Sequence, residues 1–155
     1  MANFAVNNIN AGTQQPIAAA YKSLVSIAAG ATPKRIRLYD LLIGTNGTPA
    51  DNFMEWDISR VTVAGTGTAL TPNGLDPADS AALASCLANM TVEPTVTAAS
   101  SLFYVGVNQR ASYRWVAAPG SELVAPATVA AGFAIRTRSA GYTGTATAEA
   151  LFQEQ

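Results

Sequence analysis

Three acidic residues in one short segment are the first candidates for chemistry in this sequence. Asp51, Glu55 and Asp57 lie in the run "DNFMEWD", and carboxylate oxygens are ligands that Ca²⁺ prefers. On an extended strand, Glu55 and Asp57 are two positions apart and therefore share a face. The same face also suits cross-strand ion pairs with arginine, and the candidate partners are Arg35, Arg37, Arg136 and Arg138. We therefore interpret these carboxylates as ion-paired or solvated rather than as a calcium site.

The side chains that most enzymes use for nucleophilic or metal chemistry are nearly absent. The 155 residues include no histidine, which excludes Ser–His and Cys–His nucleophile systems and any histidine-rich metal cluster. Cys86 is the single cysteine, so neither an internal disulfide nor a cysteine zinc site can form. We therefore predict no enzymatic activity, no catalytic residues, no metal and no cofactor. An enzyme that depends on calcium or on a pair of carboxylates stays as an alternative.

Aromatic residues offer one binding hypothesis. Tyr104, Tyr113 and Trp115 can form a stacking platform for a sugar, because each ring carries a large apolar face. However, the segment "SYRWV" alternates polar and apolar residues, and the apolar side of such a strand faces the core. The alternation thus favours core packing for Trp115.

The chain carries little charge. Its net charge is −1 and only 12% of its residues are charged, whereas a nucleic-acid-binding domain normally presents a basic surface. No apolar run approaches the ~18 residues of a membrane span, and "MANFAVNNIN" lacks the basic start and apolar core of a signal peptide. We predict no nucleic-acid partner, no membrane segment and no small-molecule substrate.

The first 19 residues differ in composition from the rest of the chain. The run "MANFAVNNINAGTQQPIAA" is rich in Asn and Gln and is interrupted by glycine and proline. We therefore predict an extended N-terminal arm over residues 1–19 and a β-sandwich domain over residues 20–155. Phe4, Val6 and Ile9 are the apolar residues along this arm. They pack on this domain or reach a neighbour, and we take them as candidate inter-subunit contacts. A disordered arm is the alternative.

Apolar and polar residues alternate with a period of two in most of the remaining chain, which indicates β-strands. About eight strands are expected, in the segments "YKSLVSIAA", "KRIRLYDLLIG", "FMEWDISRVTV", "SLFYVGVN", "ASYRWVA", "ELVAP", "GFAIRTRS" and "TGTATAEALFQE". In the second segment, the alternation places Ile36, Leu38 and Leu42 on one face. In the third segment, the alternation places Met54 and Trp56 on one face of the strand.

Two connections between these strands have local signals of their own. Pro119-Gly120 fits the central positions of a type II turn. The segment "RWVAAPGSELVAPAT" is therefore interpreted as a strand, a reversal and a returning strand, with Trp115 and Leu123 packed on the core. The longest connection contains three prolines. Within it, Asp76 is placed to cap a short helix that ends near Asn89, with a proline at its first position.

Many short strands with Gly and Pro turns are typical of a sandwich or a barrel. Eight strands with one long crossover suit a jelly roll, in which two antiparallel sheets pack face to face. We therefore predict an all-β, jelly-roll-like antiparallel sandwich of about eight strands, with an extended N-terminal arm and one short helix in a long loop. An immunoglobulin-like sandwich is the alternative.

Three segments resemble small structural proteins of tailed bacteriophages. They are "IRLYDLLIGTNGTPADN", "LTPNGLDPADSAA" and "NQRASYRWVAAPGSELVAPAT". The resemblance covers roughly residues 20–152 and is to capsid cement (decoration) proteins with a jelly-roll core. It implies a virion protein, assembled in the host cytoplasm, that binds the outer capsid surface as a trimer and bridges neighbouring subunits of the major capsid protein. It transfers no contact residue. A phage tail or fibre-associated carbohydrate-binding module is the alternative function.

Overall fold

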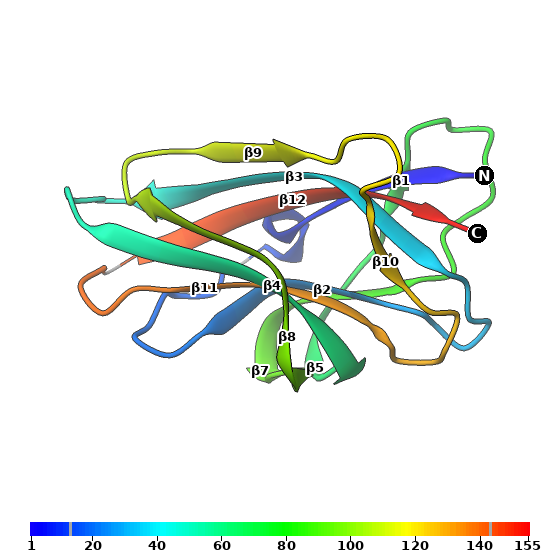
Figure 1. Ribbon diagram of the computed structural model, residues 1–155, viewed down its shortest axis with the longest axis horizontal. Coiled ribbons are helices and arrows are strands. Elements are labelled where there is room, and N and C mark those ends of the chain that lie inside the picture. The colour runs from blue at the N-terminus through cyan, green and yellow to red at the C-terminus, as the bar shows by residue number, and fades with distance from the viewer. Residues whose placement is uncertain (13, 143) are drawn as a thin grey trace.

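The chain folds into a sandwich of two antiparallel sheets, which form the upper and lower layers of Figure 1. The computed structural model describes residues 1–12, 14–142 and 144–155. Sheet A has the order β10–β3–β12–β1–β6, with β9 also paired to β3, and sheet B has the order β5–β7–β2–β11–β4–β8. The strands of sheet A are β1 (Asn3–Asn7), β3 (Ile36–Gly47), β6 (Asn73–Gly74), β9 (Tyr113–Val116), β10 (Leu123–Ala125) and β12 (Gly144–Glu154). Those of sheet B are β2 (Lys22–Ala28), β4 (Phe53–Val63), β5 (Thr66–Leu70), β7 (Ser85–Val92), β8 (Thr95–Asn108) and β11 (Gly132–Arg138).

The prediction of an all-β, jelly-roll-like antiparallel sandwich is thus confirmed. Each of the eight predicted segments contains a strand, and β1, β5, β6 and β7 complete the two sheets. The core lies between the sheets, where their inward-facing side chains meet. Met54 and Trp56 of β4 are both buried there, as the alternation predicted. From sheet A, Phe4 and Phe152 contribute an aromatic pair with ring centroids 5.6 Å apart.

The N-terminal segment is part of this core and is not a separate arm. β1 pairs with β12 from Asn3↔Gln153 to Asn7↔Glu149, so alternate side chains of β1 face inward. Phe4 and Val6 are therefore buried within their own chain, and the structure differs from the expectation that they reach a neighbour. Ile9 lies in the 3₁₀ turn that follows (Asn8–Ala11) and is exposed.

Amide side chains explain why so polar a segment is ordered. The buried Asn8 side chain donates to Ala146 O at 2.8 Å and accepts from Ala148 N at 3.0 Å. The Gln15 side chain accepts from the backbone N of Met90 at 3.0 Å and donates to the backbone O of Met90 at 3.4 Å. Each amide thus imitates a peptide group of a neighbouring strand, because it carries the same donor and acceptor. The Asn and Gln side chains suggested an exposed arm, but Asn8 and Gln15 instead extend the hydrogen bonding of the two sheets.

The predicted helix ending near Asn89 is wrong. Asp76 accepts from Ala78 N at 2.8 Å, but this bond closes only a turn. The chain is irregular up to Ala84 and then forms β7, in which Cys86, Ala88 and Met90 are the buried positions. Apolar residues spaced by two are the pattern of a half-buried strand, and here pairing with β2 and β5 outweighs the helix-forming tendency of alanine.

A bulge in β3 reverses the predicted direction of Leu42. Leu151 of β12 pairs with Asp40, and the next residue, Phe152, pairs with Leu38. Tyr39 is therefore an extra residue on β3, and beyond it the alternation shifts by one position. Leu38 remains in the core, but Leu42 points outward and is 45% exposed.

The Pro119-Gly120 turn is present, but the predicted reversal of the strand is not. Gly120 has a φ of +85° and Ser121 N donates to Ala118 O at 2.8 Å, which fits a type II turn. However, β9 and β10 both pair with β3 in the antiparallel sense, one after the other along the same edge. Residues 117–122 thus form a loop that interrupts a single edge strand.

Candidate functional site

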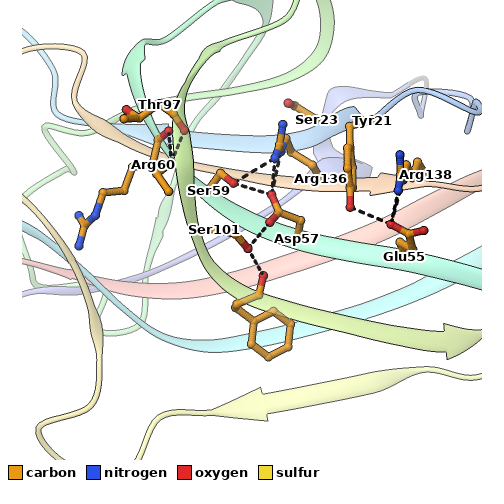
Figure 2. A network of polar contacts seen from close by, with 12 residues as sticks. Tyr21, Ser23, Glu55, Asp57, Ser59, Arg60, Thr97, Ser101, Arg136 and Arg138 are labelled. Carbon is orange, nitrogen blue, oxygen red and sulfur yellow. Dashed lines mark hydrogen bonds and ion pairs between the residues drawn. The ribbon is translucent and has the colours of Figure 1, made fainter.

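Two ion pairs form a ladder on the outer face of sheet B (Figure 2). Arg136 and Arg138 of β11 lie directly opposite Asp57 and Glu55 of β4. Their terminal nitrogens approach the carboxylates at 2.6 Å and 2.8 Å respectively. The predicted cross-strand pairing is confirmed for these two arginines. Arg37 instead pairs with Glu122 at 2.8 Å.

Asp57 is the most completely satisfied charge of this ladder. Its side chain is only 4% exposed. Arg136 donates to it through Nε at 2.9 Å and through Nη2, and the hydroxyls of Ser59 and Ser101 donate to the same carboxylate. A buried carboxylate is stable only when its lone pairs are filled in this way. The arrangement holds β4, β8 and β11 together.

Tyr21 lies between the two arginines. Its ring centroid is 4.6 Å from the guanidinium carbon of Arg136 and 4.7 Å from that of Arg138. Figure 2 shows the ring inserted between the two side chains, with its hydroxyl directed toward Glu55, to which it donates at 3.0 Å. Burial and this hydrogen bond raise the pKa of Tyr21 to about 12. The Tyr21 hydroxyl therefore stays protonated at physiological pH. The uncharged ring attracts the two guanidinium groups that lie over its faces.

The three carboxylates considered as calcium ligands each have an arginine partner. Asp51 pairs with Arg110 at 3.1 Å on the surface, away from the ladder that holds Glu55 and Asp57. In the part of the chain that the structure describes, no three Cys, His, Asp or Glu side chains are grouped so that they could hold a metal ion. The arrangement supports ion pairing as the role of these residues.

The sugar platform of Tyr104, Tyr113 and Trp115, considered above as a hypothesis, is not assembled. The rings of Tyr113 and Trp115 pack on Phe103, with centroids 6.1 Å and 5.7 Å away, and all three rings pack against the core cluster. Tyr104 follows Phe103 on the same strand and therefore points to the opposite face of sheet B. Its ring is exposed there. Core packing of Trp115 is thus confirmed.

The outer face of sheet A exposes apolar side chains that the sequence analysis did not place there. Leu42 and Ile9 line one hollow of about 180 Å³, and Leu42 and Leu151 line another of about 220 Å³. Val116 of β9 also faces outward and pairs with Asp40, on the side of β3 opposite to Leu151. We refer to Ile9, Leu42, Val116 and Leu151 as the sheet A patch.

One ion pair lies within this patch, between Val116 and Leu151. Arg114 donates to both oxygens of Asp40, at 3.0 Å and 2.5 Å. This hydrogen bonding raises the pKa of Arg114, and its side chain remains 62% exposed. An exposed arginine whose head group is already oriented can bind a further acceptor, because the guanidinium has five N–H donors.

The sequence contained a signal for this outward face. A strict period of two from Ile36 through Leu38 to Leu42 also places Asp40 on the core face, where an acidic residue is costly to bury. A polar residue at an expected core position indicates a bulge. The outward position of Phe53 at the start of β4 follows from the same alternation that buries Met54 and Trp56, because residues 53, 55 and 57 share the other face.

The fold and its contacts define an all-β sandwich whose two outer faces both combine ion pairs with exposed apolar side chains. No family model, no curated protein and no solved structure matches the chain. No helix in the described residues is long and apolar enough to cross a membrane.

Proposed function

We propose that this chain is a structural virion protein, a capsid cement protein that binds the outer surface of a phage capsid and stabilises contacts between major capsid subunits. The observation that carries the proposal is the sheet A patch. Ile9, Leu42 and Val116 are 62%, 45% and 57% exposed. Leu42 and Val116 lie on the outer face of sheet A, and Ile9, in the turn after β1, lines the same hollow as Leu42. Single exposed apolar residues are ordinary, but a contiguous apolar patch marks an interaction surface.

The composition of the patch suits a protein partner. Protein interfaces combine an apolar centre with arginine and exclude most other charges from that centre. Here the apolar side chains surround the paired Arg114 and Asp40. The exposed Glu149 lines both hollows, so a partner with a donor or a cation opposite this carboxylate fits the surface. Of the three arm residues considered as inter-subunit contacts, Ile9 is the exposed one, and the proposal assigns it to this surface.

The mode of action is binding without turnover. A protein that binds only the assembled lattice stabilises it by mass action, in proportion to the logarithm of its concentration over its dissociation constant. The resemblance to phage cement proteins supports a trimer bound to the major capsid protein in the virion. A closed trimer also covers sheet edges, which otherwise invite aggregation.

Co-sedimentation with purified capsids of the encoding phage tests the proposal. The wild-type protein is expected to sediment with capsids and to raise the temperature at which they rupture. Leu42→Asp places a charge at the centre of the patch and should weaken binding at least about tenfold. Val63→Asp, a similarly exposed position on sheet B, is the matched control and should bind normally. Capsids of normal robustness in a deletion, with the protein found elsewhere in the particle, would refute the proposal.

A further inference from the structure

Another cavity lies on the opposite side of the sandwich, at one end of the ion-pair ladder. It has a volume of about 460 Å³, and its lining includes Asn52, Phe53, Glu55 and Arg138. This volume is within the range of ligand pockets, about 300–1,000 Å³. We propose that this cavity binds a neutral saccharide, with Phe53 as the stacking ring. The proposal is independent of capsid binding, which is assigned to sheet A.

The position of Phe53 depends on a glycine in the neighbouring strand. A Cβ atom at Gly106 would lie 2.0 Å from Cε2 and 2.4 Å from Cζ of the Phe53 ring. The ring therefore rests on the backbone of β8 in space that any other residue would occupy. Even so, Phe53 is 57% exposed. An aromatic ring supported from beneath and open to solvent can stack on the apolar C–H face of a sugar.

A second aromatic residue extends the same surface. Tyr104 is also 57% exposed and is two positions from Gly106 along β8. Two residues of an extended strand span about 7 Å, and both positions face outward. A ligand that stacks on Phe53 therefore meets Tyr104 further along the strand, which favours a chain of two or more sugar units over a single unit.

The polar groups of the cavity select a ligand without charge. Arg138 donates to Glu55 through Nε at 2.8 Å, so their opposite charges compensate each other and neither an anion nor a cation is preferred. The hydrogen bonds among described residues engage Oε2 of Glu55, which leaves its second oxygen to accept from a ligand hydroxyl. The amide of Asn52, which is exposed, both donates and accepts. Hydroxyl groups match such a mixed set of donors and acceptors.

Saturation-transfer NMR with a panel of neutral saccharides tests the proposal. The panel contains glucose, galactose, mannose and N-acetylglucosamine, together with their α- and β-linked disaccharides, and titration calorimetry measures the affinity of the strongest ligand. At least one disaccharide is expected to receive saturation. Phe53→Ala should then raise its dissociation constant at least tenfold, and Asn52→Ala should raise it severalfold. Val63→Ala, an exposed apolar position on the same strand, is the matched control and should change it less than twofold.

A further variant tests the support of the ring. Gly106→Ala leaves Phe53 in the sequence but displaces its ring, so saccharide affinity should fall as in Phe53→Ala. Thermal unfolding of each variant shows whether the fold is intact, and Phe53→Leu serves if Gly106→Ala does not fold. The absence of saturation transfer to every member of the panel would overturn the proposal. Binding that is insensitive to both Phe53→Ala and Asn52→Ala would overturn it equally, because the ligand would then lie elsewhere.

Discussion

Removing the carboxylate of Asp57 should destabilise the protein far more than removing a surface carboxylate. The side chains of Asp57 and Arg136 are 4% and 19% exposed. Asp57→Ala therefore leaves a poorly hydrated guanidinium without its counter-ion, and Ser59 and Ser101 lose their shared acceptor. Breaking a buried pair from one side costs ~3–5 kcal/mol. Because the ring of Tyr21 still covers the Arg136 guanidinium in this variant, we expect a loss of stability at the lower end of that range, about 3 kcal/mol.

The chain provides a matched comparison. Asp51 and Arg110 also form an ion pair, at 3.1 Å, but their side chains are 72% and 59% exposed. Exposed pairs contribute only about 0–1 kcal/mol, so Asp51→Ala should cost less than about 0.5 kcal/mol. Urea unfolding followed by tryptophan fluorescence measures both variants, since Trp56 is buried and becomes hydrated on unfolding. In thermal unfolding, a loss of 3 kcal/mol corresponds to roughly 6–12 °C for a domain of this size.

A double variant distinguishes loss of the pair from loss of packing. Asp57→Ala with Arg136→Met removes both charges, and replacing a buried pair by apolar groups costs much less than breaking it from one side. The double variant should therefore be more stable than Asp57→Ala alone, which a simple sum of two independent losses does not allow. If Asp57→Ala costs no more than Asp51→Ala, the ladder does not stabilise sheet B and the reasoning is refuted.

Three further predictions concern glycine packing, tyrosine ionisation and the cysteine. Gly132→Ala should cost about 3 kcal/mol in urea unfolding, because its Cβ would lie 2.0 Å from Ile27 O on the adjacent strand; a loss below about 1 kcal/mol would show that β11 moves freely. The pKa of Tyr21 is about 12 in the folded protein and ~10 unfolded, so its contribution to stability is complete below pH ~10 and is lost as pH rises toward 12. The loss is about 1 kcal/mol, because solvent screens the partly exposed side chain, and Tyr21→Phe should remove this part of the pH dependence. Burial raises the pKa of Cys86, so a thiol reagent should label it only as fast as the protein unfolds; rapid labelling at neutral pH would contradict its buried position.

The sequence predicted those parts of the fold that depend on local alternation. Met54 and Trp56 occupy the core because β4 has no bulge before them, so a period of two holds. The pairing of Glu55 and Asp57 with arginines was also predictable, since residues on one strand face meet a neighbouring strand. Which arginines were involved was not predictable, because that depends on which of the candidate strands lies beside β4.

The errors arose where long-range pairing replaces a local rule. Leu42 faces outward because of one extra residue in β3, and the location of that residue depends on the pairing with β12. Phe4 and Val6 belong to the core because β1 lies between β12 and β6, two strands that are distant in sequence. The amides of Asn8 and Gln15 fix the same segment through bonds to residues at least 75 positions away. No window of neighbouring residues contains that information.

The two proposed binding surfaces lie on opposite sides of one rigid sandwich, which determines how they can act together. Leu42 points outward from sheet A, and Phe53 points outward from sheet B, with the core between them. A chain that binds a capsid through the sheet A patch therefore presents the cavity beside Phe53 to the surrounding solution. Leu42→Asp should abolish capsid binding and leave saccharide affinity unchanged, whereas Phe53→Ala should do the reverse. If either variant weakens both activities, the two ligands share a surface and the division between the sheets is wrong.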